Sequence, residues 1–509
     1  MKKFGANREE IFHLLEQEGE VTGESVARVH KATGVPEADI WGTAMFYTLI
    51  NTSGKRVRVC DGLTCQMLGG DDLARQLEDK GKSCERVSCL GQCDLAPATL
   101  DEEMELVTYG DRRTCVTADN PGLPMNLAGP VDREMQALAA ARRMDRQTII
   151  DEIKASGLQG RGGAGFPAHF KWDSVANQVE QERYVVCNAD EAEPGTFKDR
   201  EVILRQSHLM LEGLAIAAVA VGARDIFVYI RGEYVNEVRA LEKAIAECES
   251  VLGDLTVHVV RGHGAYICGE ETALLESMEG KRGMPRLKPP YPTESGFRNK
   301  PTLMHNVETI ACVPSIIHRG GQWFRDQGRT EPGSKLYCIS GHVNRPGVYE
   351  LPLGVTLDEL VEQAGGYDGN PLSFSPGGAS SGFLPMKYRD LPLDYKNLAE
   401  AGSMLGSSGV VVLNDTVDMA EAVAWQLEFF ERESCGQCAP CRIGTQYLRR
   451  QVHKYLEARE TGHLNMADDV SWEMEEGSIC GLGMVAFKPL ETARKHFPEA
   501  FSSPNGKPS

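Results

Sequence analysis

The sequence lacks a long hydrophobic run, an excess of positive charge, internal repeats and low-complexity tracts. Its longest apolar run, residues 214–223, is too short to span a bilayer and predicts a buried helix instead. Lysine and arginine number 54 against 73 aspartates and glutamates, so the formal net charge is −19. This acidic balance disfavours nucleic acid or an anionic membrane surface as a partner.

A secretory signal is also missing from the start of the chain. Lys2 and Lys3 are not followed by the apolar segment that such a signal requires. We therefore expect a cytoplasmic protein with no membrane insertion. In a reducing compartment the 15 cysteines are not expected to form a disulfide framework, and clustered ones are expected to bind metal.

The length of 509 residues predicts a multidomain α/β protein with about three or four domains. Short apolar and β-branched runs predict strands at 56–60, 184–187, 226–230, 335–340 and 347–350, and helices are expected at 71–80 and 357–364. The predicted order is a helical segment 1–50, a small α/β domain 51–120, a linker 121–144, a layered α/β domain 145–330, a domain with hairpin strands 331–410 and a helical region 411–500.

Three cysteines near the C-terminus, in the run Glu433-Ser-Cys-Gly-Gln-Cys-Ala-Pro-Cys-Arg442, are the most informative motif. Cys435, Cys438 and Cys441 have C-x2-C-x2-C spacing, and Cys480 follows in a separate segment. A structural zinc site usually combines two separate cysteine pairs. One tight loop that supplies three thiolates is more typical of a 4Fe–4S cluster, and we interpret these four residues as its ligands.

A second set of cysteines lies near the N-terminus. Cys60 and Cys65 form one pair, and Cys89 and Cys93 form another on a neighbouring loop. Two such pairs favour a 2Fe–2S cluster in which each pair holds one iron, although a zinc site has the same ligand types. Cys84 has a less suitable spacing and is interpreted as a spare thiol. The other six, Cys115, Cys187, Cys248, Cys268, Cys312 and Cys338, are scattered and are expected to be small buried hydrophobic residues.

The run Gly160-Arg-Gly-Gly-Ala-Gly-Phe-Pro167 matches G-x-G-x-x-G formally. The dinucleotide fingerprint requires a strand before it, whereas residues 148–157 predict a helix that ends at a glycine. The run is therefore not assigned to a Rossmann turn. Four glycines in six residues still indicate close approach of the backbone to phosphate or a flat ring, with Lys171 as a possible phosphate contact, and a turn without a ligand is the alternative.

Two acidic segments, residues 188–195 and 264–272, each follow a predicted strand. Charge runs usually form solvated surfaces, but α/β proteins also place ligand loops at the ends of strands. Carboxylates there accept hydrogen bonds from ribose hydroxyls and repel a 2′-phosphate, which favours NAD over NADP.

The chain resembles the NADH-binding flavoprotein subunit of respiratory complex I. The resemblance is carried by the glycine-rich run 160–167, the two acidic segments and residues 281–292 and 433–442. The resemblance covers about residues 140–500 and extends to the diaphorase subunits of NAD-reducing hydrogenases and of molybdenum- or tungsten-dependent formate dehydrogenases. Residues 1–120 resemble the thioredoxin-like 2Fe–2S subunit, here fused in front. This fusion most resembles the β subunit of NAD-dependent formate dehydrogenases. The runs that carry the resemblance are 60–65, 89–97, 376–382 and 478–483.

The resemblance implies a Rossmann-like FMN and NAD domain, a ubiquitin-like β-grasp domain and a helical 4Fe–4S domain. The FMN-lining residues that it implies are Gly160, Arg161, Gly162, Lys171, Asn188, Asp190, Glu191, Tyr266, Gly269, Glu270, Asn306 and Thr309. NAD is expected to stack on the flavin against Phe166, with Glu193, Glu271, Lys288 and Tyr291 nearby. His305, Ala192 and Ser174 depart from the family pattern, in which asparagine, glycine and an aromatic residue are usual.

Because hydride transfers two electrons and an iron–sulfur cluster accepts one, a flavin is expected between NADH and the clusters, and no side-chain general base is required. The expected partner is a catalytic α subunit with molybdenum or tungsten and further clusters, in a hetero-oligomer. The alternatives are the same module in a hydrogenase or in complex I, and a non-catalytic assembly subunit held together by zinc.

Overall fold

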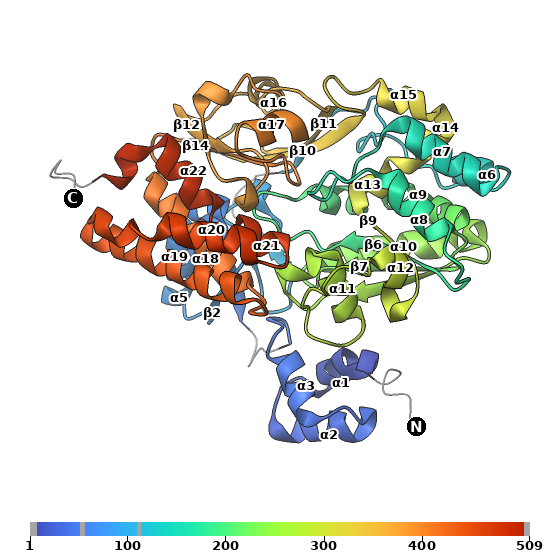
Figure 1. Ribbon diagram of the computed structural model, residues 1–509, viewed down its shortest axis with the longest axis horizontal. Coiled ribbons are helices and arrows are strands. Elements are labelled where there is room, and N and C mark those ends of the chain that lie inside the picture. The colour runs from blue at the N-terminus through green and yellow to red at the C-terminus, as the bar shows by residue number, and fades with distance from the viewer. Residues whose placement is uncertain (1–7, 51–55, 109–112, 503–509) are drawn as a thin grey trace.

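The computed structural model describes residues 8–50, 56–108 and 113–502, which fold into four regions packed around one another. Residues 1–7, on which the signal-peptide argument depends, lie outside the described residues. The first helices form a small unit at the lower edge of the molecule in Figure 1: η1 (Arg8–Glu10), α1 (Ile11–Glu18), α2 (Gly23–Thr33) and α3 (Glu37–Ala44). Thr22 and Ser25 form a capping box at the start of α2, and Gly34 ends that helix in the left-handed conformation.

The small α/β domain follows. Its sheet has the order β2-β1-β3-β4, in which β1 and β2 are parallel and the other neighbours are antiparallel. The first predicted cysteine pair begins at the last residue of β1, and the second begins two residues after β2. Because these strands are parallel, both pairs start at the same end of the sheet. The elements are β1 (Val57–Cys60), α4 (Leu63–Met67), α5 (Gly70–Asp79), β2 (Cys84–Val87), η2 (Cys93–Leu95), β3 (Thr99–Leu100) and β4 (Leu106–Val107).

The central domain is built on the parallel sheet β8-β7-β6-β9, formed by β6 (Tyr184–Ala189), β7 (Asp225–Ile230), β8 (Thr256–Arg261) and β9 (Thr302–Asn306). Because the strands are parallel, their C-terminal ends lie at one edge, where Asn188 is paired with Asn306. The helices are α6 (Gln136–Ala141), α7 (Arg146–Ser156), α8 (Ala168–Ala176), α9 (Lys198–Val221), α10 (Val235–Leu252), η3 (Tyr266–Gly269), α11 (Glu271–Met278), α12 (Pro292–Ser295), η4 (Phe297–Asn299), α13 (Val307–Ala311), α14 (Val313–Arg319) and α15 (Gly321–Arg325).

Helix α9 is the core of this domain. Among the described residues it alone has the length and hydropathy that a membrane span requires, and 78% of its apolar window is buried inside the protein. Its alanine and leucine side chains pack in the main hydrophobic cluster of the molecule. The buried helix predicted for residues 214–223 is therefore confirmed as the C-terminal half of α9.

The third region contains a six-stranded sheet of order β13-β12-β14-β10-β11-β5. The short strand β5 (Cys115–Val116) was grouped with the 51–120 domain in the sequence, yet it pairs with β11 across a long chain separation. The other elements are β10 (Ser334–Gly341), β11 (Gly347–Pro352), α16 (Leu357–Gln363), β12 (Pro371–Ser375), η5 (Ala379–Ser381), β13 (Leu384–Pro385), η6 (Met386–Tyr388), α17 (Tyr395–Glu400) and β14 (Gly409–Asn414).

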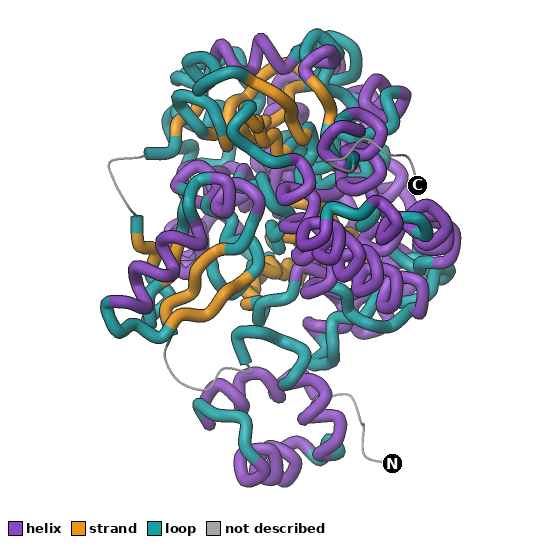
Figure 2. The backbone as a smooth tube through the Cα atoms, turned by 90° about the vertical axis from the view of Figure 1, so that its left-hand side faces the viewer, coloured by secondary structure: helices purple, strands orange, loops and turns teal. Residues whose placement is uncertain are grey.

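The C-terminal region is helical from Met419 onward, whereas the predicted start at residue 411 falls inside β14 of the six-stranded sheet. Figure 1 shows its helices stacked on the side opposite the central domain's outer helices, and Figure 2 shows them beside the central sheets with the N-terminal helices below. The elements are α18 (Met419–Glu433), α19 (Ala439–Ala458), η7 (Thr461–Leu464), α20 (Ala467–Gly477), α21 (Gly481–Val485), α22 (Lys488–His496) and η8 (Pro498–Phe501). The predicted strands and helices in the other regions are likewise confirmed as β1, β6, β7, β10, β11, α5 and α16.

We predict that Gly213→Ala destabilises the protein, although alanine usually favours a helix by about 1 kcal/mol. A Cβ at Gly213 would lie 2.2 Å from the carbonyl oxygen of Ile310, so α9 and α13 must separate. Thermal unfolding should show a lower midpoint for this variant. Gly23→Ala, in a helical position with no heavy atom within 4 Å of the added Cβ, is the matched control and should keep or slightly raise the midpoint. Equal midpoints for both variants would contradict the close packing.

Candidate functional site

A cavity of about 730 Å³ opens at the C-terminal ends of β6 and β9, between the glycine-rich loop and the start of α11. Parallel α/β sheets bind ligands at this edge because the loops that follow the strands converge there. Twelve of the predicted FMN and NAD residues line the cavity: Gly160, Gly162, Phe166, Lys171, Asn188, Gly269, Glu270, Glu271, Lys288, Tyr291, Asn306 and Thr309.

The glycine-rich loop forms one wall of this cavity. Helix α7 ends at Gly157, and the amide of Gly160 donates to the carbonyl of Phe166, which closes the loop on itself. Gly163 has a φ of 148°, and a Cβ added there would meet no heavy atom within 4 Å, so a side chain would extend into open space. A bare backbone next to a cavity suits close contact with phosphate or a flat ring.

The opposite wall carries paired charges. Lys171 Nζ lies 2.6 Å from Glu271 Oε2, and Lys288 Nζ lies 2.9 Å from Glu270 and 3.0 Å from Glu271. Burial opposes ionisation of Glu271, but the two ammonium groups outweigh it and hold its pKa at about 2. The wall therefore offers fixed charges of both signs to a polar ligand.

Aromatic side chains lie exposed at the mouth of the cavity. Phe166, Phe170 and Tyr291 are each at least half exposed, at 50%, 57% and 53%. Large apolar side chains are rarely left this open without a binding role when they share one rim. Their faces suit the stacking of planar rings such as isoalloxazine or nicotinamide.

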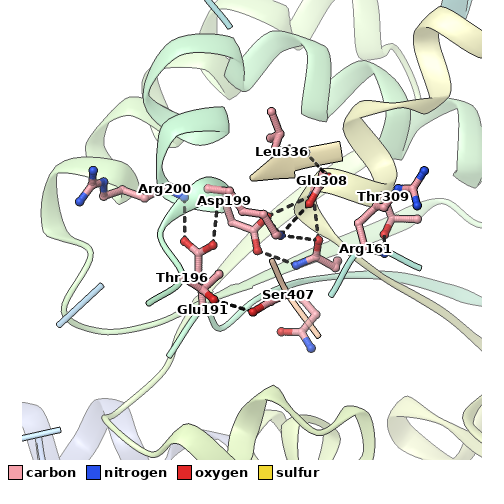
Figure 3. Close-up of polar contacts among 12 residues, drawn as sticks. Arg161, Glu191, Thr196, Asp199, Arg200, Glu308, Thr309, Leu336 and Ser407 are labelled. Atoms are coloured by element: carbon pink, nitrogen blue, oxygen red, sulfur yellow. Dashed lines mark hydrogen bonds and ion pairs between the residues drawn. The ribbon is translucent and has the colours of Figure 1, made fainter. Parts of the chain in front are cut away.

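Five predicted residues do not line the cavity. Arg161 lies behind the loop and donates to the carbonyl of Pro332, while its own amide donates to Thr309 Oγ1. Glu191 accepts from the amides of Asp199 and Arg200 and so caps the start of α9, as Figure 3 shows. Asp190, Glu193 and Tyr266 lie between the cavity and the cysteine clusters.

Beneath the cavity lies a buried network of charges, shown in Figure 3. The Glu308 carboxylate lies 3.1 Å from Lys198 Nζ and 2.5 Å from Lys335 Nζ, and it accepts from the Leu336 amide. Both lysines are fully buried. Because Lys335 and Leu336 belong to β10, the network joins the third region to α13 of the central domain.

The same network holds two residues of the cavity floor. Asn306 donates to Asp199 at 2.6 Å and accepts from Lys198, while Thr309 follows Glu308 on α13 and fixes the amide of Arg161. Lys198 pairs with two carboxylates, and its pKa is raised although burial opposes this. Lys335 pairs with Glu308 alone, and burial lowers its pKa to about 8.

The four N-terminal cysteines converge in one buried place. Cys89 Sγ lies 3.7 Å from Cys93 Sγ, and contacts with Cys65 and Cys89 raise the pKa of Cys60. The amides of Gly62 and Gly91 donate to Cys60 and Cys89. Hydrogen bonds from backbone amides stabilise thiolate sulfur, the form that binds iron.

Arginines from the central domain hold these cysteine loops in place. Arg200 donates to the carbonyl of Gly91 and to both oxygens of Asp94, which follows Cys93. Arg231 donates to the carbonyl of Cys89 and to that of Glu191. These buried arginines attach the small domain to the central domain beside the cysteines.

The C-terminal cysteines also converge, from two segments. Burial raises the pKa of Cys441 to about 12, and charge on Cys438, Cys480 and Cys435 contributes to this rise, which shows that the four are neighbours. Cys438 stands at the N-cap position of α19 and Cys480 at that of α21.

Glu270 connects the cavity to these cysteines. It lines the cavity, and its charge raises the pKa of both Cys435 and Cys480, after the larger effect of burial. Glu193 and Tyr266 form a similar connection on the other side. Their side chains are hydrogen-bonded to each other, the charge of Cys89 acts on Glu193, and that of Cys480 acts on Tyr266.

Both predicted ligand sets consist of cysteine alone, a donor set that iron–sulfur clusters and structural zinc both use. Among the described residues no three His, Cys, Asp or Glu side chains form a close group around a single point. Cys84 lies apart on β2. Five of the six scattered cysteines are buried in the hydrophobic core as predicted, whereas Cys115, on the short strand β5, is only half-buried.

Sequence reasoning did not find several residues of this site. Phe170, Thr293 and Met304 line the cavity. Arg200 and Arg231 bind the loops of the N-terminal cysteines, and Lys335 pairs with Glu308 below the cavity. Phe170 lies four residues after Phe166 on the same exposed rim, a spacing visible in the sequence. The buried charges had no local signal, because their partners lie many residues away in the chain.

We predict that Lys335→Met lowers the stability of the protein by about 3 kcal/mol, because it leaves part of the Glu308 charge uncompensated in the interior. Denaturant unfolding should show an earlier midpoint. The double variant Lys335→Met/Glu308→Gln removes both charges and should recover part of the loss. Lys387→Met, at an exposed lysine of the same region, is the control, and an unchanged midpoint for Lys335→Met would contradict the role of the network.

Comparison with known families assigns each region. Residues 153–315 match the Nuo51 FMN-binding domain, and residues 336–384 match the SLBB domain. Residues 421–504 match the NADH-ubiquinone oxidoreductase-F iron-sulfur binding region, and residues 6–111 match the thioredoxin-like [2Fe-2S] ferredoxin. The chain thus carries FMN-binding, 2Fe–2S and 4Fe–4S domains.

Individual relatives agree with these assignments. The second NADH-quinone oxidoreductase F-type subunit of Rhizobium meliloti is 46% identical over 372 residues, which are 69% of this chain and 87% of that protein. The F-type subunit of Mycobacterium tuberculosis is 45% identical over 388 residues, 72% of this chain and 87% of its own length. A solved chain of an NAD⁺-reducing [NiFe]-hydrogenase in the H₂-reduced state has a TM-score of 0.90 at 30% identity and covers 97% of this chain and 93% of its own.

The cavity with its glycine wall lies within the part of the chain that matches the FMN-binding domain, and the two cysteine sets lie within the parts that match the [2Fe-2S] and iron-sulfur binding models. Because the F-type relatives are matched over most of their own length, the chain belongs to the family of NADH-quinone oxidoreductase F-type subunits, with a thioredoxin-like [2Fe-2S] domain in front.

Proposed function

We propose that the protein is the diaphorase subunit of an NAD-dependent formate dehydrogenase and transfers electrons between NAD(H) and iron–sulfur clusters through FMN. The observation that carries the electron-transfer role is the position of Glu270, which lines the flavin cavity and acts electrostatically on two C-terminal cysteines. Glu270 is thus a residue of the cavity whose charge reaches the C-terminal cysteines.

Within this proposal, FMN would supply the conversion between the electron pair of a hydride and the single electrons that a cluster accepts. The glycine-rich loop, Lys171, Asn306 and Thr309 would hold it. Phe166, Tyr291, Glu271 and Lys288 would hold NAD, whereas Glu193, which was predicted to join them, does not line the cavity. The protein positions the rings and excludes water, and no side chain of the cavity is required as a general base.

We further propose the ligand sets of both clusters. Cys435, Cys438, Cys441 and Cys480 hold the 4Fe–4S cluster, through which electrons pass to a partner. Cys60, Cys65, Cys89 and Cys93 hold the 2Fe–2S cluster as a side reservoir. The support is the convergence of each set and the amides directed at Cys60 and Cys89.

The assignment to a formate dehydrogenase is supported by sequence resemblance, namely the fused N-terminal domain and the runs 60–65, 89–97, 376–382 and 478–483. In that case a separate α subunit with molybdenum or tungsten oxidises formate, and the complex is cytoplasmic. The alternative is the same module in a hydrogenase. The solved hydrogenase chain supports it, because that chain covers 97% of this one and thus includes the N-terminal domain.

To separate these assignments, we would purify the tagged protein with its partners from its natural host. A molybdenum- or tungsten-containing partner and NAD⁺ reduction by formate are expected. Nickel in the partner and NAD⁺ reduction by H₂ would instead support the hydrogenase alternative. A complex that passes electrons from NADH to quinone would support the complex I alternative.

We predict that anaerobic addition of NADH bleaches the flavin and cluster absorption bands of the isolated protein. Cys438→Ser should retain FMN and flavin bleaching but lose the iron and the EPR signal of one cluster, because one of four thiolate ligands is removed. Cys84→Ser, at a half-buried thiol outside both sets, is the control. A colourless protein that contains zinc and no iron would contradict the enzymatic proposal and favour the assembly role.

A further inference from the structure

His305 stands near the C-terminal end of β9 and lines the candidate flavin cavity. The ring is largely buried, with 6% of the residue exposed. Its neighbour on one side is Trp172 of α8, which is fully buried. The indole Nε1 of Trp172 lies 2.8 Å from His305 Nε2 and donates a hydrogen bond to it.

This hydrogen bond determines the protonation of the imidazole. An indole N–H can only donate, so His305 Nε2 must be the acceptor and carry no proton. A neutral imidazole with a bare Nε2 carries its proton on Nδ1. The tautomer of His305 is therefore set by a side chain on another element.

The charge state of the ring follows from its surroundings. Burial is the main cause that lowers the pKa of His305, to about 3, and the charge of Lys171 lowers it further, while Glu271 has a smaller opposite effect. These are the charged groups that act on the ring, and the buried thiol of Cys187 lies beside it on β6. The imidazole is thus neutral throughout the neutral pH range.

Among the described residues the other ring nitrogen, Nδ1, has no hydrogen-bond partner, and it does not belong to the sealed, unpartnered atoms of the protein interior. His305 lines the cavity together with Asn306 and Lys171. A donor on a residue that lines a polar cavity is suited to an acceptor atom of a bound ligand.

We propose that Trp172 is a positioning residue that holds His305 as the Nδ1–H tautomer, and that His305 donates from Nδ1 to an acceptor oxygen or nitrogen of the flavin. The proposal rests on the proposed function in that the cavity binds FMN. It adds a neutral, oriented donor to the binding site beside the charged Lys171. Such a donor keeps its strength as the pH changes, because neither its charge nor its tautomer changes.

The test measures flavin binding to flavin-depleted, full-length protein by the quenching of flavin fluorescence, with FMN and riboflavin as probes. His305→Leu should raise the Kd for FMN about five- to tenfold, the effect of one neutral hydrogen bond. His305→Asn retains a donor group and should recover part of the affinity. If riboflavin affinity falls equally, the acceptor lies in the ring or ribityl chain, and if only FMN affinity falls, the acceptor is the phosphate.

Trp172→Phe tests the positioning role, because it keeps an aromatic side chain in the core but removes the N–H donor. In Trp172→Phe burial and Lys171 still keep the imidazole neutral, but the ring is free to change tautomer, so the Kd for FMN should rise about two- to threefold. A positioning role predicts that Trp172→Phe adds no further loss of affinity in the His305→Asn background, because the amide has no tautomers. A purely structural role of Trp172 would weaken binding equally in both backgrounds.

His258→Leu, at a partly exposed histidine on β8 outside the cavity, is the matched control and should bind FMN as the wild type does. Wild-type protein that binds FMN, together with unchanged Kd values for His305→Leu and Trp172→Phe, would overturn this inference alone. Wild-type protein that binds no FMN would overturn the proposed function as well. Should His305→Leu fail to fold, the comparison of His305→Asn and Trp172→Phe with the wild type decides the question.

Discussion

The Glu308 carboxylate is the constraint on which the rest of the structure depends. It is fully buried and is compensated by two lysines, one from α9 and one from β10. A buried charge that loses its partner costs several kcal/mol, so these elements must meet in one arrangement. Because Asn306 and Thr309 flank Glu308 in the chain, the same arrangement sets the floor of the flavin cavity.

A second set of buried charges orders the path between the redox sites. Arg200 and Arg231 hold the loops of the N-terminal cysteines against the central domain. On the other side, Glu433 accepts the amide of Tyr266, at the end of α18 next to the C-terminal cysteines. Electron transfer between centres requires short, stable separations, and buried hydrogen-bonded charges provide such stability at the cost of desolvation.

The parts of the fold that sequence predicted well are those with a local signal. Strands such as β6 and β7 are short apolar runs, and α7 ends at Gly157, where the left-handed conformation favours glycine. The pairing of β5 with β11 had no such signal, because two residues contain no periodicity and the partner lies far along the chain. The burial of Lys335 had no local signal either. A lone lysine in a strand is expected at the surface, whereas Lys335 is fully buried.

The candidate site shows the same division. Residues that were inferred from a loop motif, such as the glycine-rich run, lie around the cavity as expected. Glu191 belongs to the acidic run 188–195, for which ligand binding was predicted. Its carboxylate oxygens instead accept hydrogen bonds from the first amides of α9, which need an acceptor at the helix start.

By itself the sequence determined the two cysteine sets, the glycine-rich loop, the order of the regions and the family, because each is encoded in spacing along the chain. Only the tertiary structure decided which carboxylates border the cavity, which lysines lie in the core and which nitrogen of His305 carries the proton. These depend on contacts between residues distant in the chain, such as Trp172 with His305, where burial and a single hydrogen bond select one state.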